Sequence, residues 1–173
     1  MKEIFEQALK GQVFEYAIVS TRDIIFSPEL LKSCESNVCG NYNKSWSCPP
    51  AIEDLPRQKE KIAAFPCAFV FTTRFDLEDS FDYEGMQTAK VRHNGITASL
   101  HERFGKTNPV YGAGACKLCG NCAYPQPCRF PEKTYPALEA AGINVTELSR
   151  IAGIRYNNGP NTVTYFSMIL FDE

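Results

Sequence analysis

The chain of 173 residues is 44% apolar and 12% aromatic, which is enough to bury a hydrophobic core without disulfides or a metal merely to fold. Its 18 basic residues stand against 20 acidic ones, for a net charge of −2. This balance lacks the basic excess that phosphate contacts require, so we expect no nucleic-acid partner.

The N-terminal stretch MKEIFEQALKGQVFEYAIV has no basic segment followed by an apolar stretch and a small-residue cleavage site. We therefore expect a cytoplasmic protein. The longest apolar run, residues 63–71, is far shorter than the ~20 residues of a membrane-spanning helix, so we expect no membrane association. Thiols are kept reduced in the cytosol, so eight cysteines there indicate metal binding or redox chemistry rather than structural disulfides.

The first predicted elements lead into a long loop. Residues 15–26 are expected to form a strand pair, or one strand with an extension. A short helix should follow toward Cys34, because Ser27 is a favourable N-cap and Pro28 suits the first helical position. Residues 35–50 are rich in turn formers and lack an apolar period, which predicts a long loop.

The middle of the chain is expected to hold a helix over residues 51–64 and a buried strand over 67–73. An acidic connector over residues 76–82 leads to the clearest helix, residues 83–104, which Gly105 should end. Its apolar residues lie roughly along one face: Met86, Ala89, Val91, Ile96, Leu100 and Phe104.

Capping residues mark two shorter helices near the end of the chain. Pro136 and Gly142 bracket one, and Asn144 and Gly153 bracket the other. A turn at residues 158–159 precedes a β-rich segment whose imperfect alternation predicts a strand buried on both faces.

These elements predict an α+β fold over residues 1–173 as a single domain. We expect a mixed sheet of about four strands, backed by helices, with cysteine-rich metal loops at one end. The early and late cysteine groups are separated in the sequence, and they are expected to approach each other in space.

Four cysteines fall within the late segment GACKLCGNCAYPQPCRFPEK. Cys116, Cys119, Cys122 and Cys128 have the spacing C-x2-C-x2-C-x5-C. Three thiols at x2 intervals make a tight loop that suits the irons of one [4Fe-4S] cubane, although the x5 gap departs from the ferredoxin pattern. Structural zinc more often takes two separated cysteine pairs, so the spacing favours iron–sulfur, with zinc as the alternative and no metal as a third reading.

Charged and flexible neighbours accompany the late group. Lys117, Arg129 and Lys133 are positioned in the sequence to offset the charge of a four-thiolate cluster, and Gly114 and Gly120 free backbone N–H groups for its sulfurs. The competing interpretation is that these are ordinary solvated charges and turn glycines.

The early group is Cys34, Cys39 and Cys48, the last followed by two prolines. Three thiols in one irregular loop predict a second metal site, with its fourth position left to another residue, a small molecule or nothing. The alternative is that some of these are packed thiols. A third alternative is crossed ligation, in which a cysteine of one group binds the metal of the other group. In two-cluster ferredoxins a Cys followed by Pro ligates the other cluster in this way.

Cys67 lies in an apolar strand, where burial raises a thiol's pKa and opposes ligation, so we expect it in the core. His93 and His101, on the 83–104 helix, are expected at the surface or satisfied in the core, with a lesser possibility that one completes the early site. No catalytic residues are identified, since the sequence has neither a second zincin histidine, nor a phosphate loop, nor a Ser/His/Asp set.

The segments CGNYNKSWSCPP, GAGACKLCGNCAYPQPCRFPEK and YPALEAAGINV together resemble a family of cysteine-rich predicted metal-binding proteins, domain of unknown function 2284. The likeness runs from about Cys34 to the final strand. It implies that all the cysteines except Cys67 occupy the family's cysteine positions, and it implies metal binding without naming a reaction.

Three classes of function follow from these observations. The first is an iron–sulfur protein, with one [4Fe-4S] cluster or two, that transfers electrons or assists a redox enzyme and has a redox protein as partner. The second is a zinc-stabilised interaction module without redox activity. The third is an enzyme that uses an open cluster site.

Overall fold

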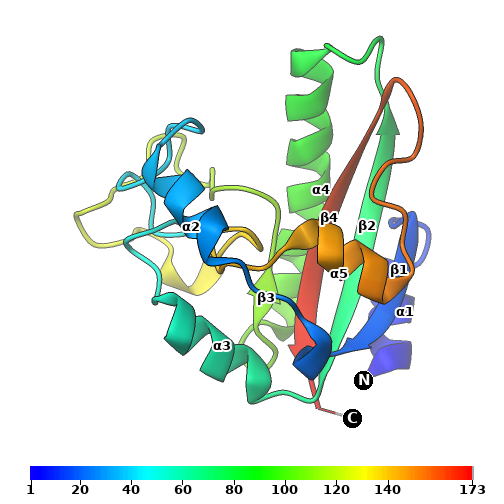
Figure 1. Ribbon diagram of the computed structural model, residues 1–173, viewed down its shortest axis with the longest axis horizontal. Helices are drawn as coiled ribbons and strands as arrows, with labels where there is room; N and C mark the ends of the chain where they lie inside the picture. Colours follow the sequence, from blue (N-terminus) through cyan, green and yellow to red (C-terminus); the bar gives the residue numbers. More distant parts are fainter. Residues whose placement is uncertain (173) are drawn as a thin grey trace.

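The computed structural model describes residues 1–172, in which the strands form one central sheet with helices on both faces (Figure 1). The elements in chain order are α1 (Lys2–Leu9), β1 (Glu15–Ser20), η1 (Thr21–Asp23), α2 (Pro28–Glu35), α3 (Leu55–Ala63), β2 (Cys67–Asp76), α4 (Tyr83–Phe104), β3 (Val110–Tyr111), η2 (Pro131–Lys133), α5 (Val145–Ala152) and β4 (Thr162–Phe171).

The sheet has the order β1-β2-β4-β3, which confirms the α+β class and the four strands. Its strand pairs are antiparallel, with Val70 of β2 opposite Met168 of β4, so the expected mixed sheet is wrong in strand direction. The long helix α4 carries the chain back along β2, and β2 and β3 consequently run the same way (Figure 1). Because β4 lies between them and runs the opposite way, both of its pairs are antiparallel, and β1 also pairs with β2 in antiparallel fashion.

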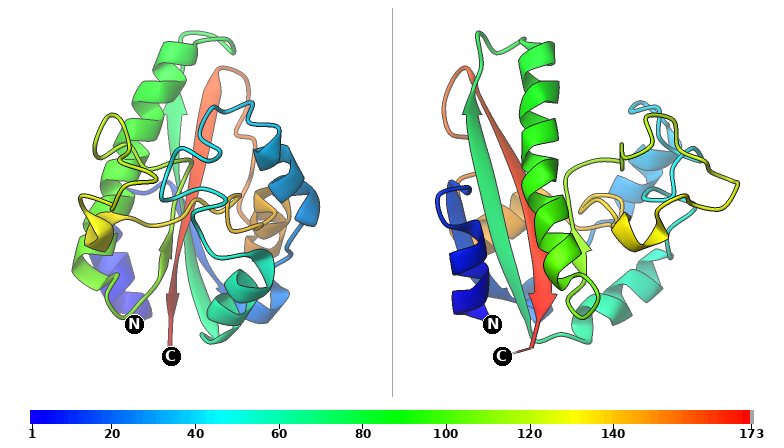
Figure 2. Two further views of the ribbon diagram at one scale, coloured as in Figure 1. Left: turned by 90° about the vertical axis from the view of Figure 1, so that its left-hand side faces the viewer. Right: turned by 180° about the vertical axis from the view of Figure 1, so that it is seen from behind.

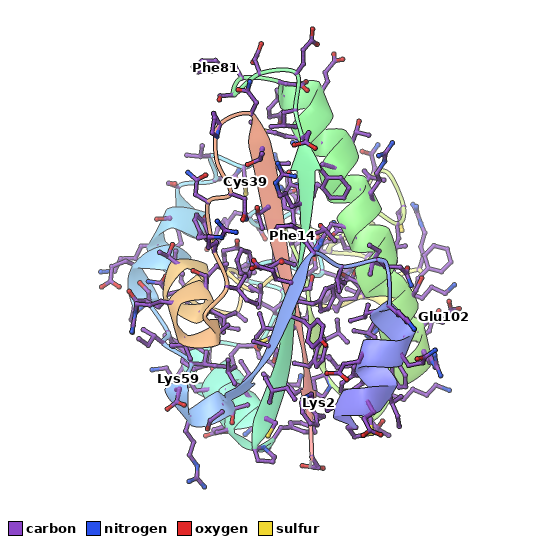
Figure 3. All side chains as sticks on the ribbon, turned by 90° about the vertical axis from the view of Figure 1, so that its right-hand side faces the viewer. Lys2, Phe14, Cys39, Lys59, Phe81 and Glu102 are labelled. Atoms are coloured by element: carbon purple, nitrogen blue, oxygen red, sulfur yellow. The ribbon has the colours of Figure 1, made fainter. Side chains whose placement is uncertain are left out.

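Alternate residues of β2 enter two different cores, as side chains on a strand must. Val70 packs in a core shared with α3 and α5, whereas Phe71 packs in a core shared with α1 and α4. Figure 3 shows this division: Lys2 of α1 and Glu102 of α4 lie on one side of the sheet, and Lys59 of α3 lies on the other. The central strands are therefore covered on both faces.

The prediction that the last strand is buried on both faces is confirmed for its second half. All residues of β4 from Phe166 to Phe171 are buried, whereas Thr162 to Tyr165 are partly accessible. A strand that is covered on both faces needs apolar residues on both, which explains why polar and apolar residues do not alternate regularly in β4.

Helix α4 has the predicted bounds, and Asp82 caps it by accepting a 2.8 Å hydrogen bond from the Gly85 N–H. Ala89 and Leu100 are buried on its inner face as expected. Val91 is 70% exposed and does not belong to that face. Two residues turn an α-helix by about 200°, so Val91 lies nearly opposite Ala89.

Helix α5 is confirmed with Asn144 as its N-cap, and Gly153 ends it in the left-handed conformation at φ 66°. Helix α3 is shorter than the expected 51–64. It starts at Leu55, because Asp54 accepts a 3.1 Å hydrogen bond from the Arg57 N–H and so defines the first turn.

Helix α2 begins at Pro28 as predicted and carries Cys34 near its end. The Ser27 hydroxyl donates to the Glu29 carboxylate at 2.7 Å rather than accepting from the helix N–H groups. Residues 36–54 then contain no helix or strand, which confirms the long loop.

Residues 136–142 do not form the expected helix. Ala137 forms an isolated bridge with Gly112, and Ile143 forms another with Phe26. The Leu138 N–H donates to the Gly112 carbonyl at 3.0 Å, so backbone groups that a helix would use are bonded to a distant segment. The Pro and Gly at the ends of this stretch therefore bracket a turn.

The two cysteine-bearing segments, residues 34–54 and 112–136, lie side by side and project from the sheet near its β3 edge (Figures 1 and 2). We call them the cysteine lobe. The expected gathering of the cysteine loops in one place is thus confirmed. The short strand β3, which the sequence did not predict, pairs with β4 just before the second segment begins.

Candidate metal centre

The four late cysteines border one narrow pocket inside the cysteine lobe. Each of the four is partly accessible and none forms a disulfide. The other lining residues come from both segments of the lobe and are mostly apolar: Trp46, Leu118, Gly120, Ala123, Arg129, Phe130 and Thr134. The structure therefore brings together the four donors that the C-x2-C-x2-C-x5-C spacing predicted as one set.

A tight turn gives the late segment its shape. Gly114 and Gly120 both have a φ of 68°, a conformation that glycine adopts without strain. The Gly120 N–H closes the turn by donating to the Lys117 carbonyl at 3.2 Å. This local folding lets Cys116 and Cys119 border the same pocket.

Hydrogen-bond donors converge on the sulfur of Cys122. Burial acts to raise the pKa of this thiol, but the backbone N–H groups of Tyr124 and Trp46 and the Ser45 hydroxyl act against it. The pKa of Cys122 lies below its usual value as a result, because these donors stabilise the thiolate. A thiolate is the form that binds metal.

Cys116 shows that the four sulfurs influence one another. Burial raises its pKa first, and negative charge on the other three late cysteines raises it further, while the Leu118 N–H opposes the rise. The Cys128 sulfur lies 3.5 Å from the Thr134 hydroxyl, which itself donates to the Phe130 carbonyl at 3.1 Å. A cation within the pocket would relieve the mutual repulsion of these thiolates.

The three early cysteines also form a cluster. Burial raises the pKa of both Cys34 and Cys48, and charge on neighbouring early thiols adds to the rise in each case. The pKa of Cys39 is lowered, chiefly by the backbone N–H and side-chain amide of Asn41. Cys48 is buried and Cys39 is exposed, so the cluster extends from the interior of the lobe to its surface.

Two buried serines, for which the sequence predicts no role, connect the early and late groups. The backbone N–H of Cys116 donates to the Ser47 hydroxyl at 2.7 Å, and that hydroxyl lies 3.9 Å from the Cys48 sulfur. Ser45 and Ser47 are bonded to each other through their hydroxyls at 3.0 Å. The expected approach of the two cysteine groups is therefore confirmed.

Trp46, between these serines, anchors the two loops. Its indole N–H donates to the Gln126 carbonyl at 2.9 Å, and its ring lies edge-to-face against Tyr124 at 5.0 Å. Residues 45–48 form a turn, in which the Cys48 N–H donates to the Ser45 carbonyl at 3.2 Å, and no local sequence pattern marks this junction.

Two charged residues, Glu139 and Lys90, influence the early cysteines and were not predicted from the sequence. Glu139 is exposed, yet desolvation by the surrounding protein raises the pKa of its carboxyl, and Lys90 partly offsets this. The negative charge of Glu139 contributes to the raised pKa of Cys34, whereas Lys90 helps to lower that of Cys39. Neither residue has a local sequence pattern that marks it.

Cys67 and His93 lie apart from the cysteine lobe, whereas His101 contacts it. Cys67 starts β2 and packs against the core shared with α1 and α4, as predicted. His93 is fully buried, with its ring nitrogens 2.8 Å from the Thr73 hydroxyl and 2.7 Å from the Ser167 hydroxyl. Burial lowers the pKa of His93 to about 4, so it is a neutral core residue. His101 instead donates through Nε2 to the Glu132 carbonyl at 3.0 Å.

Among residues 1–172, no three side chains of His, Cys, Asp or Glu stand close enough together to hold a single metal ion. For comparison, four thiolates around one tetrahedral zinc, at ~2.3 Å from the metal, are only about 4 Å apart from each other. The late cysteines border a shared pocket instead of meeting at one point.

A comparison with known protein families identifies the family of this chain. Residues 17–171 match the family described as predicted metal-binding protein, DUF2284. The chain belongs to this family. The match includes both cysteine groups, most of β1, all of β2, β3 and β4, and every residue of the cysteine lobe. No curated protein and no solved structure matches the chain.

Membership in DUF2284 confirms the resemblance drawn from the cysteine segments and supports metal binding at the level of the family. In the part of the chain that the structure describes, no helix has the length and apolar character needed to cross a membrane.

Proposed function

We propose that this DUF2284 protein is an iron–sulfur protein whose late cysteines hold a [4Fe-4S] cluster. In this proposal it transfers electrons to or from a redox protein, or supports a redox enzyme in that way. When bound, such a cluster supplies a one-electron redox centre whose potential depends on charge, hydrogen bonds and exposure.

The observation that carries the proposal is the pocket bordered by Cys116, Cys119, Cys122 and Cys128. Two successive x2 intervals let three thiols surround several irons of one cubane. The x5 interval then leads to the fourth thiol, that of Cys128, which borders the same pocket. Four thiolates that share one pocket are the usual complete ligand set of a [4Fe-4S] cluster.

The surroundings of the sulfurs also fit a cluster. Backbone N–H groups and the Ser45 hydroxyl act on Cys122, and the Thr134 hydroxyl lies near Cys128. Hydrogen bonds to cluster sulfurs raise a reduction potential by stabilising the more negative, reduced state. Arg129 lines the pocket, and its positive charge would also raise the reduction potential.

We also propose that Cys34, Cys39 and Cys48 form a second metal site next to the first. Three thiols whose charges influence one another supply three positions, which leaves at least one position without a cysteine. Ser47 lies between the two groups, and this short separation would suit electron transfer between them.

A spectrum recorded after strictly anaerobic purification tests the proposal. We expect a brown protein with broad absorption that bleaches on reduction, and we expect Cys119→Ser to remove most of the late-site signal. Cys67→Ser is the matched control because Cys67 lies in the sheet outside the lobe, and its spectrum should equal that of the unchanged protein. A colourless protein with stoichiometric zinc would instead identify a zinc-stabilised interaction module.

A further inference from the structure

A second hollow lies between α4 and the segment that leads into the late cysteines. It has a volume of about 240 Å³. We call it the α4 groove. One wall is a single face of α4, at positions spaced three or four residues apart: Gln87, Lys90, Val91, Asn94, Gly95 and Ala98. Residues 114–118, with Lys133 and Tyr135, form the other wall.

The charge of the α4 groove is positive. Lys90, Lys117 and Lys133 line it, and no Asp or Glu is among its lining residues. None of the ion pairs within residues 1–172 involves these three lysines. The Lys117 ammonium donates to the neutral Asn41 side chain at 3.3 Å, so it has no carboxylate partner among the described residues. This charge favours an anionic occupant.

Asn94 gives the groove an unsatisfied hydrogen-bond acceptor. Its Nδ2 donates to the Ala113 carbonyl at 3.1 Å, but its Oδ1 is buried and has no hydrogen-bond partner among the described residues. The neighbouring Tyr135 hydroxyl donates to the backbone carbonyl of Asn94 at 3.3 Å, so it does not serve this oxygen. Buried acceptors are normally paired, so this oxygen is an unsatisfied polar atom in the wall of the groove, although it is not exposed to an occupant.

The remaining surface of the groove is apolar and open. Val91 is 70% exposed here, and Ala98 lies two turns further along the same helix face. No atom lies within 4 Å of the position that a Cβ on Gly95 would occupy. Glycine within a helix costs about 1 kcal/mol relative to alanine, and here it leaves free space against the helix.

We infer that the α4 groove binds a small organic anion. The anion carries an acidic group that pairs with the lysines and an apolar ring or short chain that lies along Val91 and Gly95. The groove is slightly smaller than the ~300–1,000 Å³ typical of sites for drug-sized molecules, which restricts the occupant to a small one. The inference does not depend on which metal the late pocket holds, although the two sites share Cys116 and Leu118.

A matched pair of probes tests the inference with the anaerobically purified protein. 2-Aminobenzoate is a small aromatic anion with an N–H donor, and 2-aminobenzamide has the same ring and donor without the negative charge. In calorimetric titrations we expect saturable, one-to-one binding of the acid. We expect the neutral amide to bind at least about tenfold more weakly, because hydrogen bonds to charged groups are the stronger ones.

Variants locate the binding. Lys90→Gln should weaken 2-aminobenzoate binding by about fivefold or more, since it removes a charge, whereas Arg92→Gln on the exposed side of α4 should not. Gly95→Leu should abolish binding by filling the groove, and Ser99→Leu, exposed and outside the groove, should not. Gly95→Leu has ordinary helical geometry, so circular dichroism should show an intact fold.

Three results would overturn the inference: no binding of 2-aminobenzoate at millimolar concentration, equal binding of the acid and the amide, or affinities unchanged by both Lys90→Gln and Gly95→Leu. Metal content measured in parallel on each variant should stay constant. That measurement separates failure at the groove from failure of the iron–sulfur proposal.

Discussion

The Ser47 hydroxyl accepts a 2.7 Å hydrogen bond from the backbone N–H of Cys116, 69 positions further along the chain. Ser47 is fully buried and precedes Cys48, the last of the early cysteines. This single bond therefore connects the loop that carries the early group to the turn that carries the late group. It makes the geometry of each group dependent on the other.

Replacing Ser47 by Ala should destabilise the cysteine lobe. The change leaves the buried N–H of Cys116 without its acceptor, which should lower the free energy of unfolding by about 1–3 kcal/mol in urea titrations. Ser36→Ala is the matched control, because its exposed hydroxyl donates only to a local carbonyl and should cost less than about 0.5 kcal/mol. Equal effects of the two changes would contradict the proposed role of Ser47.

The early group should account for roughly half of the bound metal. Replacing Cys34, Cys39 and Cys48 together by Ser should remove that share while the late site keeps its own, because the late pocket has four cysteines without them. Metal analysis of the folded triple variant checks this. Unchanged metal content would exclude a second site, and complete loss would indicate one shared cluster with crossed ligation.

Cys67 should be dispensable for metal binding. It packs at the start of β2, so Cys67→Ala should cost on the order of 1 kcal/mol of stability, with no change in metal content. Stability from denaturant titration and metal content from the same preparation test both parts. Loss of a full metal equivalent would show that all eight cysteines take part in ligation.

The buried neutral His93 should make the protein less stable in acid. Its pKa is lowered from 6.5 to about 4 by burial, so between these values the unfolded chain takes up a proton that the folded protein does not. The contribution of His93 is therefore fully present above about pH 6.5, and about 2 kcal/mol of it is lost by pH 4.5.

His93→Gln removes this titration while keeping a donor and an acceptor for Thr73 and Ser167. Denaturant titrations at pH 7 and pH 4.5 should show a smaller loss of stability in the variant than in the unchanged protein. An equal loss in both proteins would assign the acid sensitivity to other groups.

Local signals in the sequence predicted the elements whose ends are capped locally. The bounds of α4 and α5 follow from residues such as Gly105, Asn144 and Gly153, each acting within one turn of its helix. Residues 136–142 carry similar signals but form a turn, because Ala137 pairs with Gly112 from another part of the chain. Strand β3 is two residues long and has no pattern to read.

The candidate site likewise has parts that the sequence predicted and parts that it did not. The spacing of the late cysteines predicted that they belong together, since a short loop limits where its residues can lie. The Ser47 bridge, the Trp46 anchor and the charge of Lys90 depend on contacts between segments that are far apart in the sequence. Sequence spacing carries no information about such contacts, so these residues became visible only in the folded chain.

Iron and acid-labile sulfide per chain, measured after strictly anaerobic purification and reconstitution, test the central claim most directly. The late pocket should contribute about four irons and four sulfides, and these should remain when Cys34, Cys39 and Cys48 are replaced. Zinc alone, with no iron or sulfide taken up on reconstitution, would contradict the assignment of Cys116, Cys119, Cys122 and Cys128 to a [4Fe-4S] cluster.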